Sequence, residues 1–397
     1  MNTSLSKLTI HPPEQTARQQ LTARVKLLAA RNGLSVNAVT TADPFTELAE
    51  HLENHIAAGH VEGMDWFTAE RARESTDVRN LHPTAKSIIS FGLAYWSGPA
   101  HKPDDGIIRG RISRYAWGRD YHRVLKRRMK SLCADMQAEL GCELDVRILV
   151  DTARIVDRAV AARAGLGWYG KSANLIVPGH GTWVLLGEMV TELDLEPDKP
   201  LSRNCGNCTI CIDNCPTGAI VGPYTIHAPS CISYLTIELR EAIPYDLRPK
   251  MQDWVYGCDV CQDVCPYTGA AKKVDEPELQ PTTVNNAFPS LHWLLEMTQE
   301  EFGETYFGTP VPRTKRRGLA RNAAVALGNI GSDDDVSVLI RALTSHDEAV
   351  VRGHAAWALG RIAGKDALAA LDRSWTADSD ASVREECEWS LDRVGTE

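Results

Sequence analysis

The cysteines carry the most specific chemical pattern of this sequence, because eight of the eleven fall between residues 200 and 270. The first run has the spacing C-x2-C-x2-C-x3-C-P and contains Cys205, Cys208, Cys211 and Cys215. Bacterial two-cluster ferredoxins have this spacing, and the fourth cysteine of such a run ligates the other cluster. The run therefore predicts an iron-sulfur module in which the two clusters share their ligand runs.

A second cysteine set completes this pattern. Cys231 stands alone, and Cys258, Cys261 and Cys265 follow in "CDVCQDVCP", where one cysteine of the usual run is missing. Cys231 is available to replace the missing ligand. The crossing rule assigns one [4Fe-4S] cluster to Cys205, Cys208, Cys211 and Cys265, and the other to Cys215, Cys231, Cys258 and Cys261.

Zinc and disulfides are the alternatives for these thiols. Zinc requires only four tetrahedral ligands, usually from two separate knuckles, whereas this segment offers eight thiols with a proline after each run. Disulfides are not expected in a cytosolic chain. We interpret the segment as an electron-transfer module, which need not be the catalyst. The other three thiols, Cys133, Cys142 and Cys387, are expected to be small buried hydrophobic groups.

A candidate acid follows a predicted strand over residues 145–151. Ligands often gather outside strand ends, so Asp151 is placed where a catalytic carboxylate is common. The alternative is that Asp151 or Thr152 caps a helix. Asp157, beside Arg158, is expected to form an ion pair on a helix surface and is kept as the fallback acid.

The sequence "GLGWYG" at 165–170 matches G-x-G-x-x-G. It follows a predicted helix and precedes a predicted strand, so the dinucleotide-binding mechanism, which needs a helix N-terminus, is not expected. We expect Gly165 to end the helix and the rest of the loop to let a ligand approach the backbone.

Several elements must position these residues. Hydrophobic patterns predict strands over 85–96 and 145–151 and a helix over 121–141, which indicates an α+β or α/β domain. A chain of 397 residues is long enough for two or three domains. The cysteine segment has little apolar surface for a core and is expected to need bound metal centres for its stability. A polar, proline-bearing linker over 272–290 follows it.

The C-terminal region contains an internal repeat. Similar alanine-rich stretches begin at Arg321, Arg352 and Arg384, with spacings of 31 and 32 residues. Alanine and leucine recur at helical intervals and two copies end in glycine, which predicts stacked helix pairs of the HEAT type. An ordinary helical bundle is the alternative.

Composition limits the function classes. A formal charge of -9 argues against indiscriminate coating of nucleic acid but leaves room for a local basic groove. The sequence has no run of eighteen apolar residues, and its N-terminus has no apolar signal core. We expect a cytoplasmic protein without a membrane partner.

Four stretches carry a family resemblance, in the same order along nearly the whole chain. They are "ISRYAWGRDYHRVLKRRM", "VDTARIVDRAVAARAGLGWYGKSANLIV", "LLGEMVTELDLEPD" and the cysteine pattern. Together they resemble the epoxyqueuosine reductases, cobalamin-dependent iron-sulfur enzymes that complete queuosine at the tRNA wobble position. The resemblance implies a multidomain α+β fold: an N-terminal α/β cobalamin-binding domain at 1–195, a ferredoxin-like two-cluster module at 196–275, and a linker with all-α HEAT-like repeats at 276–397.

The implied reaction is a reductive deoxygenation that consumes two electrons and two protons and releases the epoxide oxygen as water. Cobalamin supplies a nucleophilic Co(I), and the protein supplies electrons, position and a proton. Asp151 would be the general acid, kept protonated by an apolar, cofactor-covered site. The chain has no D-x-H-x-x-G motif, in keeping with a family that binds cobalamin without a protein histidine ligand. The resemblance suggests these cobalamin contacts: Arg71, Tyr115, Asp151, Ser172, Asn174 and Thr217.

The implied partners are a tRNA anticodon stem-loop carrying epoxyqueuosine and an unidentified electron donor, with the chain as a monomer. Two basic runs, at 123–130 and 313–321, could contact tRNA phosphates, although such runs are usually solvated helix faces. The second run opens the repeat domain. Its candidate tRNA-binding residues are Arg313, Lys315, Arg316, Arg317 and Arg321.

Two rival functions remain open from the sequence. A reductive dehalogenase-like enzyme would also combine cobalamin with two clusters and would act on a small organohalide. A ferredoxin-type electron carrier fused to a HEAT scaffold would have no active site of its own, which leaves the strand-end acid and the glycine loop without a role.

Overall fold

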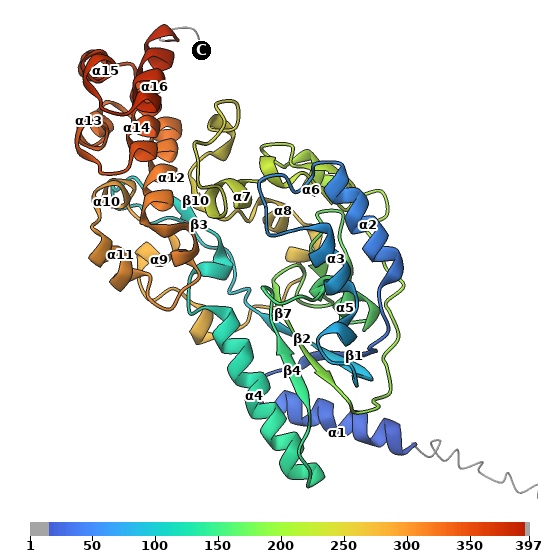
Figure 1. Ribbon diagram of the computed structural model, residues 1–397. Coiled ribbons are helices and arrows are strands. Elements are labelled where there is room, and N and C mark those ends of the chain that lie inside the picture. Colours follow the sequence, from blue (N-terminus) through green and yellow to red (C-terminus); the bar gives the residue numbers. More distant parts are fainter. Residues whose placement is uncertain (1–15, 394–397) are drawn as a thin grey trace, which may run out of the picture.

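The computed structural model describes residues 16–393, so part of the N-terminal stretch searched for an export signal lies outside it. A mixed helix-and-sheet body occupies the lower part of Figure 1, and a stack of helices rises from its upper left. The mixed class and the C-terminal helical repeats predicted above are confirmed. No helix in the described part of the chain is long and apolar enough to cross a membrane.

A four-stranded sheet forms the centre of the N-terminal part. Its strand order is β1-β2-β7-β4, and every neighbouring pair is antiparallel. The N-terminal part is therefore of the α+β kind, and the predicted strands over 85–96 and 145–151 are β2 and β4. The strand bounds are β1 (Val36–Thr41), β2 (Ser87–Ala94), β4 (Val146–Leu149) and β7 (Val184–Thr191).

Helices cover both faces of this sheet because its strands are apolar on both sides. Ile89 and Phe91 pack in one core cluster with residues of α1 (Ala17–Arg31) and α4 (Tyr121–Leu140), whereas Ile88 packs on the other face near α5 (Asp157–Arg163). Alternate side chains of a strand point to opposite faces, so the central strand β2 is buried from both sides. α4 is the helix predicted over 121–141.

The remaining N-terminal elements are short and lie around this core. They are α2 (Thr46–Ala57), α3 (Ala69–Thr76), β3 (Arg111–Ile112), β5 (Trp168–Tyr169) and β6 (Leu175–Ile176).

The cysteine module is built from very short elements and is tied to both neighbours. β10 pairs in parallel with β3, which brings a segment of the N-terminal part into the module. On the other side, the Asn322 side chain donates hydrogen bonds to the carbonyls of Thr236 and Val255. The module elements are α6 (Ile210–Asp213), β8 (Ile220–Gly222), β9 (Thr225–Ile226), α7 (Ile232–Ile237), β10 (Trp254–Tyr256) and α8 (Val260–Asp263).

Three short helices precede the repeats, and the repeats stack as helix pairs. α12 packs on α14, and α14 packs on α16, so equivalent helices of successive units lie side by side. This is the stacking that the 31- and 32-residue spacings predict. The bounds are α9 (Val284–Ala287), α10 (Leu291–Glu296), α11 (Gln299–Thr305), α12 (Lys315–Ile330), α13 (Val336–Ser345), α14 (Ala349–Ile362), α15 (Lys365–Ala377) and α16 (Ala381–Asp392).

A buried ion pair fastens the repeats to the module and gives a stability prediction. Arg248 and Glu386 form two hydrogen bonds of 2.9 and 2.6 Å, and both side chains are buried. Arg248→Met leaves the Glu386 carboxylate buried without its partner, so we expect a loss of about 3–5 kcal/mol in urea unfolding. The double variant Arg248→Met/Glu386→Leu should recover most of this loss. A loss in the double variant as large as in the single one would contradict the account.

Candidate active site and cysteine centres

The two cysteine runs have the same local structure. Helices α6 and α8 pack against each other. The amide of Cys215 donates to the Ile212 carbonyl and that of Cys265 to the Gln262 carbonyl, each at 3.2 Å. A proline follows both cysteines and cannot extend the helix. The chain therefore turns at the same point of both runs and separates the fourth cysteine from the three residues before it.

The thiols influence one another in two groups. Burial raises the pKa of Cys211, and the nearby Cys205, Cys265 and Cys208 raise it further. Burial likewise raises the pKa of Cys261 together with the nearby Cys231 and, more weakly, Cys215.

The same holds for Cys258, whose pKa is raised by burial, by Cys261 and by Cys231. These neighbours are the two sets given by the crossing rule. All eleven cysteines are free thiols. Outside the sets, Cys387 is buried and Cys133 is partly buried, but Cys142 is exposed, so its interpretation as a buried hydrophobe was wrong.

Asp151 lies in the loop between β4 and α5 and contacts the first turn of α4. His122 stands between two carboxylates: its Nδ1 is 2.7 Å from Oδ1 of Asp120, and its Nε2 is 3.2 Å from Oδ2 of Asp151. Tyr121 stacks on the His122 ring with centroids 4.2 Å apart. α5 begins after Val156, so neither Asp151 nor Thr152 is its N-cap.

His122 controls the protonation state of Asp151 in this structure. Burial alone would raise the pKa of Asp151, but the hydrogen bond and charge of His122 outweigh burial and lower it. The same contacts raise the pKa of His122 to about 9, although burial opposes this. In this structure Asp151 is therefore ionised at neutral pH, and the proton of the pair resides on His122. The expected protonated state of Asp151 belongs to a cofactor-covered site and stays a prediction.

Two further carboxyl groups lie near Asp151: that of Glu188 is buried, and Asp157 is half-buried. Burial and the charge of Asp151 raise the pKa of Asp157 to about 7. Burial and the neighbouring Asp157 raise the pKa of Glu188, whose Oε1 accepts a 3.3 Å hydrogen bond from Ser90. Within residues 16–393, Oδ1 of Asp157 and Oε2 of Glu188 are buried without a hydrogen-bond partner. The prediction that Asp157 forms a surface ion pair with Arg158 was wrong.

The backbone around the site is unusual at two non-glycine positions. Asp151 has φ +48° and Ala173 has φ +60°, which is uncommon for side chains other than Asn and Asp. Arg158 Nη1 donates to the Ala173 carbonyl at 3.1 Å. Arg158 thus links the acidic loop to the 171–174 loop that approaches the thiols.

The glycines at 165–170 serve internal packing. Gly165 has φ +80° just after α5, as the helix-ending role requires. A Cβ on Gly165 would lie 2.2 Å from the Lys199 carbonyl oxygen, and one on Gly167 would lie 2.5 Å from that of Ile176. The space at these two glycines is filled by the chain's own backbone, so the expected opening for a ligand there is not observed.

The suggested cobalamin contacts fall into two groups. Asn174 Nδ2 lies 3.5 Å from Cys261 Sγ and 3.3 Å from Ser172 Oγ, and Thr217 Oγ1 is 3.8 Å from Cys215 Sγ. These three residues adjoin the second thiol set.

The other two adjoin the acid. Arg71 Nη2 donates to the carbonyl of Thr152 at 3.1 Å, and Tyr115 stacks edge-on against Tyr121 with centroids 6.1 Å apart. The candidate residues therefore lie in two places, beside the second thiol set and beside the acidic loop.

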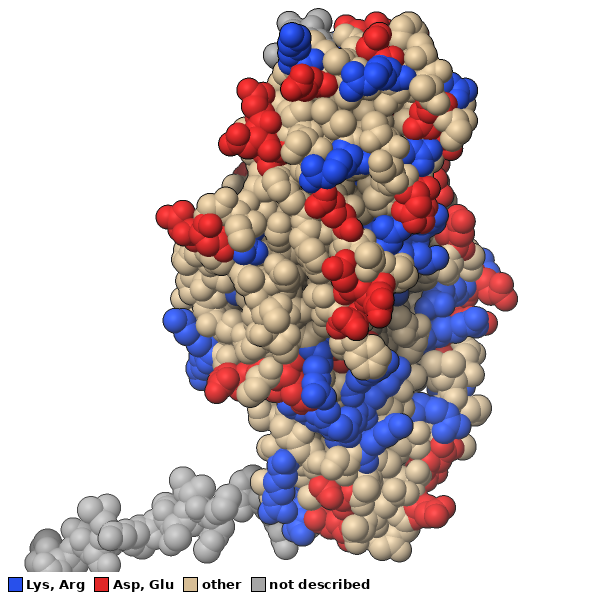
Figure 2. All heavy atoms as spheres, turned by 90° about the vertical axis from the view of Figure 1, so that its left-hand side faces the viewer, with Lys and Arg blue, Asp and Glu red and all other residues tan. Residues whose placement is uncertain are grey.

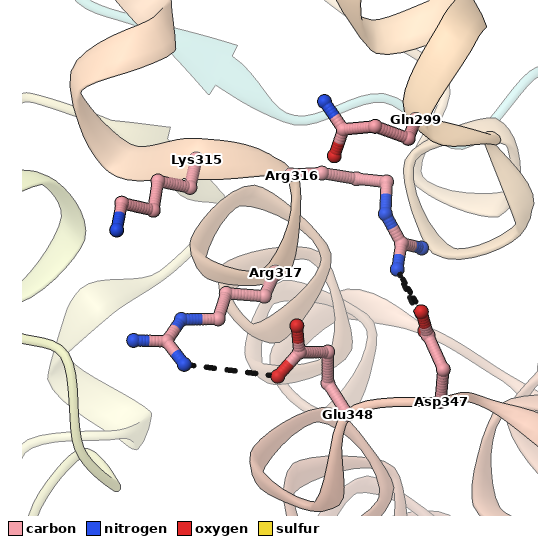
Figure 3. A pocket seen from close by; sticks show the side chains of 6 residues that line it. All are labelled: Gln299, Lys315, Arg316, Arg317, Asp347 and Glu348. Atoms are coloured by element: carbon pink, nitrogen blue, oxygen red, sulfur yellow. Dashed lines mark hydrogen bonds and ion pairs between the residues drawn. The ribbon is translucent and has the colours of Figure 1, made fainter.

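The candidate tRNA residues of the second basic run differ in their environment. Arg316 pairs with Asp347 at 2.5 Å, and Arg317 lies 3.7 Å from Glu348, whereas Lys315 points away from both acids (Figure 3). These five residues and Gln299 line a shallow pocket. Arg313 pairs with Glu238.

Arg321 does not belong to this surface. Its side chain is 1% exposed and donates to the carbonyls of Leu235, Leu239 and Glu241. Its assignment to tRNA binding was wrong, because α12 packs this position against the 235–241 segment of the cysteine module.

The first basic run forms a more continuous surface. Arg123, Lys126 and Lys130 are exposed, and their spacing places them on one face of α4. Within residues 16–393 none of these three side chains has a carboxylate within ion-pair distance. Figure 2, which faces the side of the molecule with α4, shows basic side chains gathered over its lower half. The N-terminal end of this face lies beside His122.

Sequence reasoning missed the role of His122 and gave Arg158 only an ion pair with Asp157. The sequence "DYH" at 120–122 offered one signal, a histidine flanked by a carboxylate at a predicted helix start. Its second partner, Asp151, is 29 residues away in sequence and could not be assigned without the fold.

Comparison with known proteins gives a consistent family. Three family models match: Epoxyqueuosine reductase QueG, DUF1730, at residues 76–152; a 4Fe-4S double cluster binding domain at 204–268; and HEAT repeats at 315–392. The epoxyqueuosine reductase of Synechocystis sp. is 40% identical over 283 residues, which are 71% of this chain and 96% of that protein. The one from Xanthomonas campestris is 36% identical over 335 residues, 84% of this chain and 93% of its own.

Solved structures agree over most of the chain. A crystal structure of epoxyqueuosine reductase with an epoxyqueuosine-modified tRNA-Tyr stem loop has a TM-score of 0.88 at 32% identity, covering 94% of this chain and 99% of that chain. A Bacillus subtilis epoxyqueuosine reductase, with an aspartate-bearing catalytic loop swung out of its active site, has a TM-score of 0.86 at 32% identity, covering 94% and 98%.

The His122 contacts predict a pH-dependent stability. The folded-state pKa of about 9 is above the ordinary 6.5, so the stabilisation is fully present below pH 6.5 and is lost as the pH rises through 9. His122→Gln should therefore lower the melting temperature at pH 6 and have little effect at pH 10, with a difference of at most about 3 kcal/mol. The exposed His101, changed to Gln, is the control. An effect of His122→Gln that is equal at both pH values would contradict the assignment.

Proposed function

Since this chain belongs to the epoxyqueuosine reductase family, we propose that it reduces epoxyqueuosine to queuosine in tRNA. The observation that carries the proposal is the match to such enzymes along 93–96% of their length, with all three segments in the same chain. The small-molecule dehalogenase alternative is not favoured by these relatives. The carrier alternative is disfavoured by the Asp151, His122 and Asp157 cluster, which electron transfer alone does not require.

The double cluster domain at 204–268 is the electron path. We assign the more exposed position to the first thiol set, because Ile210, between Cys208 and Cys211, is exposed. The second set adjoins the acidic site through the contact of Asn174 with Cys261. In this arrangement electrons enter at the first cluster and leave at the second.

Cobalamin is proposed to lie between the second thiol set and Asp151. The residues present fit such a group: Ser172, Asn174 and Thr217 offer polar atoms on the cluster side, and Arg71 and Tyr115 lie on the acid side. When bound, cobalamin would supply the nucleophilic cobalt that opens the epoxide. The protein residues would hold it and exclude water from the reacting atoms.

The protein's own task in the reaction is to provide protons. The net reaction needs two electrons and two protons, and the epoxide oxygen leaves as water. His122 holds one proton next to Asp151, so the pair can deliver it to the oxygen with Asp151 as the contact group. Asp157, with a pKa of about 7, holds a second proton near neutral pH. The proton source is thus a cluster and not an isolated protonated aspartate.

The tRNA is proposed to lie along the basic face of α4 and to reach the first turn of α12. Arg123, Lys126 and Lys130 are free to neutralise phosphates, which fixes position without reading sequence. Arg316 and Arg317 contribute less, because Asp347 and Glu348 already neutralise them. The N-terminal end of α4 then brings the substrate strand to His122 and Asp151.

The acid assignment gives a kinetic prediction. Asp151→Asn in protein reconstituted with clusters and cobalamin, with dithionite as reductant, should slow single-turnover formation of queuosine by roughly 10²- to 10⁴-fold. Affinity for the tRNA stem-loop should not change. Asp145→Asn, an exposed carboxylate at the other end of β4, is the matched control. Full turnover in Asp151→Asn together with loss of turnover in Asp157→Asn would assign the acid role to Asp157. Absence of turnover in the wild-type protein would contradict the proposed function.

The α4 surface gives a binding prediction. Lys126→Glu/Lys130→Glu should weaken stem-loop binding by roughly tenfold or more and reduce the slope of log K against log salt by about 2. Arg316→Ala/Arg317→Ala should have a smaller effect. Lys365→Glu, an exposed lysine on α15, should have none. A larger loss from the α12 variant than from the α4 variant would contradict this ranking.

A further inference from the structure

An exposed apolar patch lies on the first cysteine loop. Ile210 is 40% exposed, Val221 is 55% exposed and Tyr224 is 44% exposed. They come from α6 and from the β8-β9 hairpin, and α6 packs on β8. Large exposed apolar side chains that cluster in this way mark interaction sites in proteins. We call these three residues the entry patch.

Contacts tie the entry patch to the first cluster loop. Lys171 bridges them: its Nζ donates to the carbonyl of Gly206, between Cys205 and Cys208, at 2.7 Å, and its carbonyl accepts from the Tyr224 amide at 2.9 Å. A partner seated on the patch would therefore lie directly against the ligands of the first cluster.

A second aromatic contact extends the surface to the other cysteine run. The guanidinium of Arg203 lies 5.5 Å from the ring centroid of Trp168, which packs edge-on against Tyr267 at 5.1 Å. Tyr267 is 37% exposed and follows Cys265 by two residues. Exposed apolar groups thus flank both runs that supply the first cluster.

The rim of this surface is basic in a chain of net charge -9. The three segments that meet here, 165–181, 199–215 and 265–273, have one acidic residue, Asp213, which accepts a 2.8 Å hydrogen bond from Thr209. Their basic residues are Lys171, Lys199, Arg203, Lys272 and Lys273. An apolar centre with a charged rim of one sign is suited to brief docking of a partner of opposite charge.

We propose that the entry patch and its basic rim are the docking site for an acidic, low-potential one-electron carrier protein. The inference rests on the proposed function, in which electrons enter at the first cluster. Each docked carrier gives up one electron and is oxidised, while the first cluster is reduced by one electron. Two such events supply the two electrons of one turnover.

RNA is a less suitable occupant of this surface. In Figure 1 α6 lies on the right of the molecule, whereas α12 and α4, with the proposed tRNA surface, lie on the left. The tRNA must present its reactive base at Asp151, beside the N-terminal end of α4. A carrier on α6 and a tRNA on α4 can therefore be bound at the same time.

The test measures cluster reduction, which needs neither cobalamin nor tRNA. Reduced flavodoxin is mixed with the cluster-loaded full chain, and cluster bleaching is followed by stopped-flow absorbance. Arg203→Glu should lower the second-order rate by roughly tenfold at low salt and flatten its salt dependence. Tyr224→Asn, which keeps a side chain that tolerates the local φ of +68°, should weaken binding of oxidised flavodoxin in calorimetry. Lys365→Glu should change neither quantity.

The outcomes separate this proposal from the proposed function. Reduction by excess dithionite, stem-loop affinity and dithionite-driven turnover should stay at wild-type levels in both variants. Unchanged flavodoxin rates would overturn the proposal, as would an equal loss with dithionite, which would locate the defect in the clusters. Loss of tRNA affinity would assign the patch to RNA, and conversion of a wild-type dimer to monomer would assign it to a second copy. If the wild-type protein accepts electrons from flavodoxin but forms no queuosine, the proposed function is contradicted and the docking proposal still stands.

Discussion

The crossing of the two cysteine runs is the constraint on which the rest of the structure depends. The first set takes three thiols from one run and one from the other, and the second takes Cys258 and Cys261 from one run, Cys215 from the other and Cys231 from between them. α6 and α8 must therefore pack together before either set is complete. The module's elements are only two to six residues long, and its apolar side chains, among them Ile232, Leu235 and Val255, join the same core cluster as the repeats. Its neighbours hold it in place through the β3-β10 pair and through Asn322.

The same packing brings the acidic loop close to the second thiol set. Asn174 contacts a thiol of the second set, and the preceding residue, Ala173, accepts a hydrogen bond from Arg158 on the helix that also carries Asp157. The acidic loop and the module are therefore connected within a few residues. Burial and the like charge of Asp151 let Asp157 hold a proton, whereas Arg158 and His122 lower its pKa.

Two separate surfaces follow from this arrangement. The basic face of α4 and the opening of the repeats lie on one side of the molecule, and the first cysteine loop lies on the other (Figure 1). An enzyme that receives electrons from a protein and acts on a large RNA benefits from such a separation, because neither partner must leave before the other binds. The net negative charge then limits nonspecific RNA binding to the local basic faces.

The features that depend on local spacing could be predicted from the sequence: the cysteine runs, the helix over 121–141, the strand over 85–96 and the repeats at 31 and 32 residues. These patterns are set by neighbours within one or two turns of chain. It took the folded arrangement to show that Arg321 is buried against carbonyl groups, that the pKa of Asp157 is raised, and that His122 lowers the pKa of Asp151. Burial and charge pairing arise between residues far apart in sequence, so a single chain read along its length does not reveal them.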